Sequence, residues 1–249
     1  MKTKLLFAGL LIAFSIACNK SNDTSNTAVD PDSLHNRSIG ASANELLSAG
    51  KYKSLKVEVQ YMAGFAPDAT AIGHLKNFLE TQLSKPDGVT IVTKEIAGVA
   101  NTALNANEVH TIEKANRTVF SSGTEIAVYI LYTNGNYSDN NVLGIAYRNT
   151  SAAIFGKKVR DNSGGVGQAS RAKLEATVLE HEIGHLIGLV DIGSPMQSAH
   201  KANGSHCNNQ ACLMYYASET TDVLGFLVTG NIPSLDAACI NDLRANGGK

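Results

Sequence analysis

Hydrophobic positions along the chain follow two spacings, and each spacing predicts a different element. Between residues 54 and 64 every second residue is apolar, which predicts a β-strand. Between residues 67 and 84 the apolar residues recur every third or fourth position behind a proline, which predicts a helix. Similar patterns predict strands over residues 88–97, 124–133, 141–148 and 152–160, and helices over 103–117, 168–189 and 233–245.

The order of these elements predicts the fold class. Strands alternate with helices, which is typical of an α/β fold with a mostly parallel, twisted sheet. Residues 124–133 are apolar nearly throughout, as a buried central strand would be. The short segments 141–148 and 152–160 are expected near the sheet edge. After residue 191 the chain is rich in Gly, Ser and Asn until the last helix. We therefore expect one domain over 45–249, with an upper part over 45–190 and a smaller lower part over 191–249.

The N-terminus has the pattern of an export signal. Residues 1–17 carry two lysines and then a short apolar run, which is too short to span a bilayer and is typical of a signal peptide. The ending "SIAC" resembles a bacterial lipobox, which would make Cys18 a lipidated first residue. Residues 18–44 are polar and are expected to be a disordered tether. The sequence thus predicts an exported, membrane-anchored lipoprotein of a bacterial cell envelope. A plain signal peptide with an incidental cysteine is the alternative.

Composition and charge narrow the partners only slightly. The net charge is −1 and 43% of the residues are hydrophobic, so nothing indicates binding to nucleic acid. Three cysteines remain beyond Cys18: Cys207, Cys212 and Cys239. In an exported protein such thiols tend to oxidise, and a disulfide between Cys207 and Cys212 is one possible pairing. Because three is an odd number, either one thiol is free or the group serves a metal.

The stretch "HEIGHLIGLVD", residues 181–191, carries the candidate chemistry. His181 and His185 are four apart on a predicted helix, so both imidazoles can bind one metal ion. Glu182 lies beside the first histidine and can take a proton from a zinc-bound water. Gly188 allows the helix to end and the chain to bend back, which would bring Asp191 to the ion as an oxygen ligand.

Two more histidines offer an alternative for the third ligand. His200 and His206 lie in a polar loop, where surface histidines are the ordinary expectation. The rival hypothesis is that one of them replaces Asp191 at the metal across a longer loop.

These residues resemble the metzincin clan of zinc metallopeptidases, and Asp191 resembles the third ligand of the snapalysin branch. In "CNNQACLMYY", Met214 matches the methionine that the clan places in a tight turn beneath the metal. The resemblance implies that Tyr216, or Tyr215 in its place, approaches the metal.

The spacing of Cys207 and Cys212 before this methionine is also similar to archaemetzincins, which hold a second, structural zinc. Cys239 matches a third ligand of that zinc, but Asp242 stands where the fourth cysteine is expected. We therefore expect one catalytic zinc.

The predicted function is zinc-dependent endopeptidase. An extended peptide or protein substrate would pair with the edge strand over 152–160, and Glu182 would serve as general base and then as general acid. An inactive, surface-anchored binding lipoprotein and a hydrolase of non-peptide amides are the alternatives. The intact Glu182 argues against the inactive protein.

Overall fold

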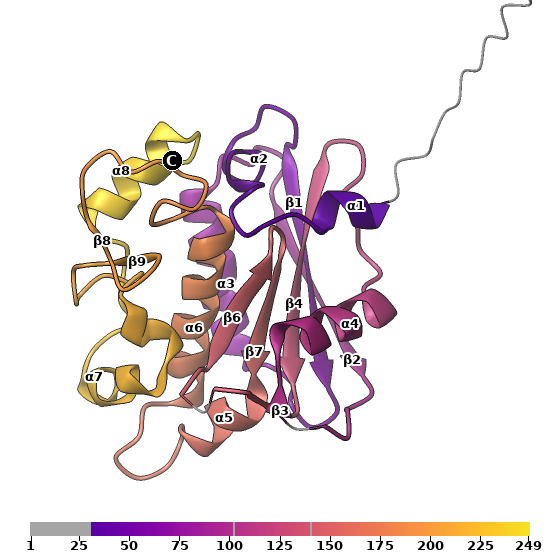
Figure 1. Cartoon of the computed structure of the whole chain (residues 1–249), viewed down its shortest axis with the longest axis vertical. Coiled ribbons are helices and arrows are strands. Elements are labelled where there is room, and N and C mark those ends of the chain that lie inside the picture. The colour runs from indigo at the N-terminus through magenta and orange to yellow at the C-terminus, as the bar shows by residue number, and fades with distance from the viewer. Residues whose placement is uncertain (1–30, 102, 140) are drawn as a thin grey trace, which may run out of the picture.

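Five strands form the central sheet of the computed structural model, which describes residues 31–101, 103–139 and 141–249 (Figure 1). The strand order is β2-β1-β4-β7-β6. The strands are β1 Ser54–Met62, β2 Val89–Ile96, β4 Glu125–Thr133, β6 Gly144–Arg148 and β7 Ser151–Phe155. All neighbours are parallel except β6, which pairs antiparallel with β7. The predicted α/β fold with a mostly parallel sheet is confirmed, and β4 lies in its middle, as its apolar sequence indicates.

The prediction of an edge strand over 152–160 is wrong. β7 lies between β4 and β6, and all five of its residues are buried. From Gly156 the chain forms helix α5 (Gly156–Asp161) instead of continuing as a strand. The apolar run therefore marks a strand with partners on both sides. β6 is the edge strand at that end of the sheet.

Helices cover both faces of the sheet. Helices α3 (Ala69–Gln82) and α6 (Arg171–Leu186) pack on one face, and α4 (Ala106–Asn116) packs on the other (Figure 1). The side chains of β4 alternate accordingly, with Ile130 on the α3 and α6 side and Leu131 on the α4 side. The side chain of Ser170 caps α6 by accepting from the backbone N–H of Lys173.

The predicted tether is packed against the domain from residue 33 onward. It contains helices α1 (Pro31–His35) and α2 (Ala43–Leu47). The side chain of His35 is buried, with an exposed fraction of 2%. The Arg37 backbone N–H donates to Asn149 Oδ1 at 3.0 Å, and the Asn149 N–H donates to Arg37 O at 3.1 Å. The expectation of disorder over 18–44 is thus wrong for this part, because polar groups of the segment find buried partners. The signal peptide and Cys18 lie outside the described residues.

The chain after α6 forms a smaller part made mostly of turns (Figure 1). It holds β8 (Lys201–Ala202), β9 (His206–Cys207), the 3₁₀ helices η1 (Tyr216–Glu219) and η2 (Thr221–Val223), and helices α7 (Leu224–Thr229) and α8 (Ala237–Ala245). A short pair of strands, β3 (Ala103–Leu104) and β5 (Asn136–Tyr137), completes the fold. Among the described residues, no helix has both the length and the apolar character needed to cross a membrane.

Candidate metal centre

Helix α6 brings His181 and His185 together. The helix is buried without a break from Leu174 to Leu186, because the sheet, α3 and the C-terminal part surround it. The Nε2 atoms of His181 and His185 are 3.2 Å apart. Residues four apart on a helix project from one face, so this closeness follows from the sequence spacing.

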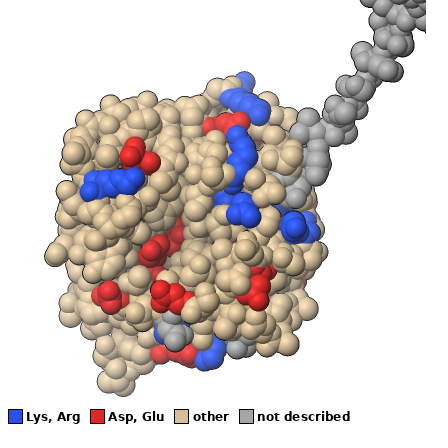
Figure 2. All heavy atoms as spheres, viewed as in Figure 1, with Lys and Arg blue, Asp and Glu red and all other residues tan. Residues whose placement is uncertain are grey.

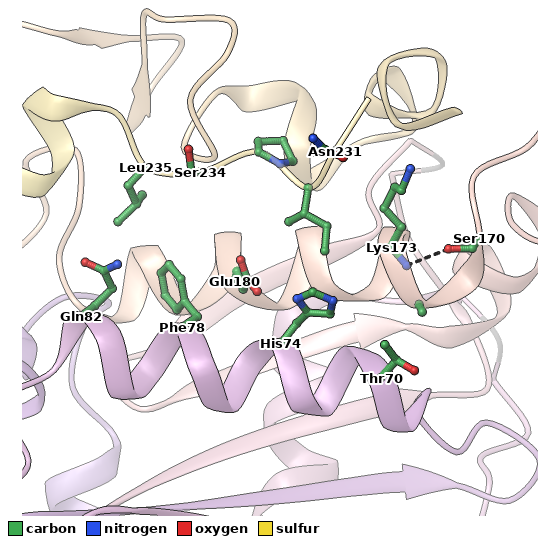
Figure 3. Close-up of a pocket in the computed structure, with 13 residues that line it drawn as sticks. Thr70, His74, Phe78, Gln82, Ser170, Lys173, Glu180, Asn231, Ser234 and Leu235 are labelled. Atoms are coloured by element: carbon green, nitrogen blue, oxygen red, sulfur yellow. Dashed lines mark hydrogen bonds between the residues drawn. The ribbon is translucent and has the colours of Figure 1, made fainter. Parts of the chain in front are cut away.

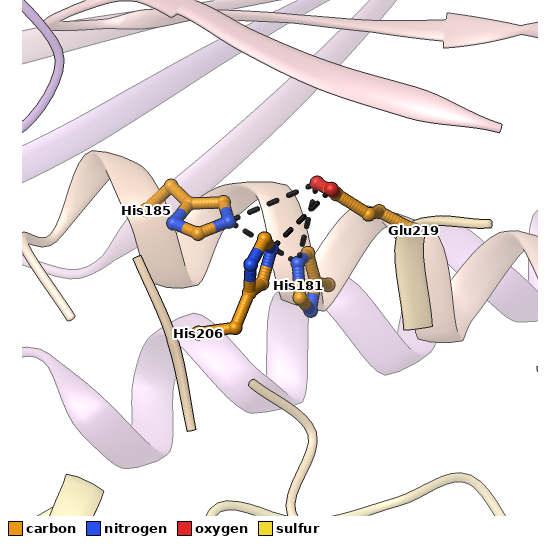
Figure 4. Close-up of side chains that lie close together, drawn as sticks. All are labelled: His181, His185, His206 and Glu219. Carbon is orange, nitrogen blue, oxygen red and sulfur yellow. Dashed lines mark hydrogen bonds and ion pairs between the residues drawn. The ribbon is translucent and has the colours of Figure 1, made fainter. Parts of the chain in front are cut away.

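Two residues from the C-terminal part complete the group (Figure 4). His206 comes from β9 and Glu219 from the end of η1. The Glu219 carboxylate is 3.5 Å from His181 Nε2, 3.9 Å from His185 Nε2 and 3.3 Å from His206 Nε2. The ligand atoms of these four residues all lie within 4.8 Å of one another.

Backbone carbonyls fix the orientation of two of the imidazoles. His181 Nδ1 donates to the carbonyl of Leu213 at 2.7 Å, and His206 Nδ1 donates to that of Asn203 at 2.7 Å. A carbonyl oxygen only accepts, so both Nδ1 atoms carry the proton. Both Nε2 atoms then offer a lone pair toward the centre of the group.

The backbone also positions the two residues from the C-terminal part. The N–H of Cys207, next to His206, donates to the carbonyl of Met214 at 2.7 Å. The carbonyl of Glu219 accepts from the N–H of Leu143 at 2.7 Å, which ties η1 to the loop before β6.

Asp191 does not join this group. Its side chain is 48% exposed and lies 3.5 Å from Lys201 Nζ. Gly188 ends the helix region with φ of 84°, as expected, but Val190 and Asp191 also have positive φ, at 55° and 69°. The N–H groups of Ile192 and Ser194 donate back to the Gly188 carbonyl, which closes a tight turn with Asp191 on its outside. The expectation that Asp191 lies beside His181 and His185 is therefore wrong, and His206 stands in that place.

Glu182 lies beside the histidines in a buried environment, with an exposed fraction of 1%. Neither carboxylate oxygen has a hydrogen-bond partner at standard geometry. Burial, and then the charge of Glu219, raise the pKa of Glu182 well above its usual range. Burial alone would also raise the pKa of Glu219, but hydrogen bonds from His181 and His206 hold it well below its usual range. The environment thus shifts the pKa values of the two carboxyl groups in opposite directions.

A cavity of about 410 Å³ opens onto Glu182, His185, His206 and Glu219. Its apolar lining includes Ile39 from the N-terminal segment, Ile145 and Ala146 from β6, and Ile192. Figure 2 shows this face of the molecule hollowed near its centre, with acidic side chains in the hollow.

Met214 lies directly under α6, and the predicted tyrosine does not reach the site. A Cβ added to Gly184 would overlap the sulfur of Met214, so the side chain packs against the helix between the two histidines. The Tyr216 side chain is half-buried, and a hydrogen bond with Tyr215 raises its pKa. Tyr215 lines a different cavity, of about 180 Å³. Neither tyrosine belongs to the group of four.

The cysteines form a second group in the C-terminal part. Cys207, Cys212 and Cys239 are free thiols, and with Asp236 they bring four ligand atoms within 4.8 Å of one another. Cys212 Sγ is 3.7 Å from Cys239 Sγ, and Cys207 Sγ donates to Asp236 at 3.3 Å. A hydrogen bond from Cys239 lowers the pKa of Cys212 to about 7.

The disulfide between Cys207 and Cys212, one possible pairing from the sequence, is not present. Asp242, at the position of the fourth cysteine, instead faces His200 Nε2 at 3.3 Å. His200 Nδ1 donates to the Ser198 carbonyl at 2.8 Å, and His200 Nε2 lies 3.6 Å from Cys239 Sγ. His200 is nevertheless a member of neither group of four.

Sequence spacing predicted that His181 and His185 lie together with Glu182 beside them, but it did not single out His206 and Glu219, the other two members of the first group. His206 was recognised only as an alternative, because the loop before it has no fixed length. No sequence pattern indicated Glu219, since a carboxylate five residues after Met214 matches no known spacing of metal ligands. Both are set by tertiary contacts with β6 and the Met214 turn.

Comparison with known proteins agrees with this geometry. The profile of metallopeptidase family M12 matches residues 75–226, which is more than half of the chain. The comparison with curated protein sequences gave no match. The crystal structure of archaemetzincin from Methanopyrus kandleri is similar, with a TM-score of 0.54 and 15% identity over 78% of this chain and 96% of that chain. This likeness concerns the fold and confirms the metzincin-like architecture.

Metalloproteinase-II from Bacteroides fragilis aligns with a TM-score of 0.47 and 16% identity, over 80% of this chain and 54% of that chain. The family is decided by the match to residues 75–226, which contains the helix with both histidines, His206 and Glu219. The chain belongs to metallopeptidase family M12.

Proposed function

We propose that the protein is a zinc-dependent endopeptidase whose ion is held by His181, His185 and His206. The observation that carries this is the spacing of the ligand atoms. Atoms bound to zinc at about 2.0–2.1 Å in tetrahedral geometry lie about 3.3 Å apart. Four contacts among the ligand atoms measure 3.2, 3.3, 3.5 and 3.9 Å, and three of them lie within about 0.2 Å of this value. Three imidazoles with inward lone pairs and one carboxylate also suit zinc chemically.

Glu219 stands at the fourth corner of the group. A catalytic zinc site needs an open position, whereas a structural site is closed by four protein ligands. Glu219 therefore has to move aside before substrate and water enter. Its position on a short 3₁₀ helix, 23% exposed, is compatible with such a movement.

Glu182 is the general base. Bound zinc would act as a Lewis acid and lower the pKa of a bound water. The burial that raises the pKa of Glu182 makes its carboxylate a better proton acceptor. Glu182 then passes the proton to the amine that leaves. His181 keeps its orientation during these steps because Leu213 O accepts its other N–H.

Strand β6 supports a peptide as substrate. In the described sheet it is paired on one side only, with β7, and its residues Ile145 and Ala146 line the cavity beside the four-residue group. An extended peptide can add to such an edge through backbone hydrogen bonds. In cleavage within a chain, the substrate extends on both sides of the scissile bond. Pairing of an extended peptide with β6 therefore favours an endopeptidase.

The test combines metal analysis with cleavage of casein and of a peptide library. Glu182→Gln should retain zinc and lose at least about 100-fold in rate, because a general base contributes 10²–10⁴-fold. Zinc without cleavage in the parent would favour the inactive binding protein. Cleavage of simple amides but of no peptide would favour the third alternative. Failure to bind zinc after refolding with it would overturn the proposal.

We propose a structural metal for the group of Cys207, Cys212, Asp236 and Cys239. Thiolates and a carboxylate are ordinary zinc ligands, and a closed set of four is typical of structural sites. Cys239→Ser should lower the metal content by one equivalent while His206→Ala lowers it at the other group. Equal metal content in Cys239→Ser and the parent would contradict this.

We propose, from the N-terminal sequence, that the protein is an exported lipoprotein anchored through Cys18. Cys18→Ala should move it from the membrane fraction to the soluble fraction of the expressing bacteria. An unchanged distribution would contradict the anchor.

A further inference from the structure

A second cavity lies on the other side of the metal-binding helix (Figure 3). It measures about 610 Å³ and is bounded by α3, by α6 and by the segment 231–235. This volume lies within the range of small-molecule sites, about 300–1,000 Å³. Much of its wall is apolar, with Phe78, Ile232, Pro233 and Leu235.

Glu180 points into this cavity from α6 (Figure 3). It precedes His181, and at 3.6 residues per turn it projects about 100° away from His181 and about 140° away from His185. The exposed fraction of Glu180 is only 7%. Over the described part of the chain, its carboxyl group takes part in no hydrogen bond or ion pair. Burying a carboxyl group without a partner is costly, so an unpaired one at the floor of a cavity indicates a missing partner.

The neighbouring cation does not supply that partner. Lys173 also lines the cavity, but its ammonium donates to the carbonyls of Leu227 at 3.0 Å and Gly230 at 2.7 Å. His74 lies at the other wall with an exposed side chain. The cavity thus combines one unpaired carboxyl group with a largely apolar wall.

We infer that this cavity binds a ligand that carries one ammonium or guanidinium group on an apolar body. The cation would pair with Glu180, and the apolar body would pack against Phe78 and Leu235, where the ring of Phe78 also favours a nearby cation. Two sources offer this chemistry: a free organic amine, and a lysine or arginine side chain of a bound polypeptide. The site is separate from the metal group and does not depend on the proposed peptidase activity.

Titration of the full, zinc-treated chain with benzylamine tests this inference. Calorimetry or ligand-observed NMR measures the binding. Benzyl alcohol, which lacks the charge, should bind at least about tenfold more weakly, since a hydrogen bond to a charged group contributes that much. Glu180→Gln should remove this preference. Ile232→Trp narrows the cavity from the opposite wall and should weaken benzylamine binding without touching α6. Glu80→Gln, which removes an exposed carboxylate of α3, should change nothing.

Three outcomes would overturn the inference. Benzylamine fails to bind at about 10 mM, a weak limit for a ligand of its size; Glu180→Gln binds it as tightly as the parent; or a peptide hydroxamate at the metal group displaces it. A leucine-flanked peptide with a central arginine, compared with its citrulline analogue, separates the two sources. Arginine-dependent binding tighter than that of benzylamine assigns the site to a polypeptide side chain, and the reverse order assigns it to a free amine.

Discussion

The third histidine decides how the metal would be held. His206 points its Nε2 lone pair into the group because its Nδ1 donates to Asn203, whereas Asp191 faces Lys201 at the surface. His206→Ala should therefore weaken zinc binding by more than about 100-fold. Loss of only the residue that hydrogen-bonds to a metal ligand already lowers metal affinity by about 10–100-fold. Asp191→Ala is the matched control and should bind zinc like the parent. Competition with a chelator measures both. The assignment fails if Asp191→Ala loses the zinc and His206→Ala keeps it.

Burial of His35 makes the free energy of unfolding depend on pH. Burial, and then the charges of Arg117 and Arg37, lower the pKa of His35 to about 3. Its Nε2 accepts a hydrogen bond from the N–H of Ser121, which a protonated ring cannot do. Between the folded pKa of about 3 and the unfolded value of 6.5, the unfolded chain binds more protons. The contribution of His35 to the free energy of unfolding is thus present above pH 6.5 and is lost as the pH falls.

The change of the free energy of unfolding with pH, and not its value at one pH, distinguishes His35→Phe from the parent. His35→Phe loses a hydrogen bond at every pH, but it should lose less additional stability than the parent between pH 7 and pH 5. Urea unfolding at a series of pH values measures this. Parallel curves for the two proteins would show that His35 does not titrate as described.

At the scale of elements, Gly184 lets the Met214 turn approach helix α6. A Cβ at Gly184 would overlap the Met214 side chain, which is fully buried. Gly184→Ala should lower the free energy of unfolding by about 1–3 kcal/mol through overpacking. Gly73→Ala in helix α3 is the matched control, because nothing lies within 4 Å of a Cβ there. It should raise stability by about 0.5–1 kcal/mol through helix propensity. Equal effects of the two substitutions would rule out the close packing.

The N-terminal segment is a structural element and not a tether. His35, Ser42 and Ala43 are buried, and Gly40 packs so closely on the Ile192 backbone that a Cβ would overlap it. A chain that begins at residue 31 should therefore melt like the full chain. One that begins at residue 45 should melt several degrees lower, because it loses Ala43, His35 and their contacts. Thermal unfolding of both chains measures this. Identical melting temperatures would show that residues 31–44 do not stabilise the domain.

Much of the element order could be predicted, and the failures have physical reasons. The alternating pattern of 54–64 and the apolar run of 124–133 correspond to β1 and β4, because burial there depends on local sequence. The run from Ala152 did not reveal that β7 has neighbours on both sides, since pairing is decided by distant residues. The composition of residues 33–44 did not reveal their packing, because a distant residue, Asn149, satisfies two of their polar groups. Asn149 Oδ1 accepts from the Arg37 N–H, and Asn149 Nδ2 donates to the Ser42 hydroxyl oxygen.

For the whole molecule, the candidate metal groups join segments that are far apart in sequence. The histidine group connects α6 to β9 and η1, and the cysteine group connects β9 to the start of α8. Spacing along one helix predicted His181 and His185 because the helix itself sets their distance. No local rule sets the distance from α6 to His206 or Glu219, so only the folded chain brings them together.

Removal of metal should consequently loosen one part of the molecule more than the other. A ligand at 100 times its dissociation constant stabilises the folded state by about 2.7 kcal/mol. Treatment with a chelator should therefore lower the melting temperature and speed up hydrogen exchange in residues 198–220 and 234–240. Strands β1 and β4 should keep their protection, because their contacts lie within the sheet and its helices.

Two variants separate the contributions of the two groups in the same hydrogen-exchange measurement. With zinc present, His206→Ala should speed up exchange around η1 and leave residues 236–239 protected. Cys239→Ser should do the opposite, because Asp236 and Cys239 begin α8 and have no partner in the histidine group. If chelation changes exchange uniformly over the sheet as well, the two parts unfold as one unit. The metal groups would then stabilise the whole domain and not the C-terminal part alone.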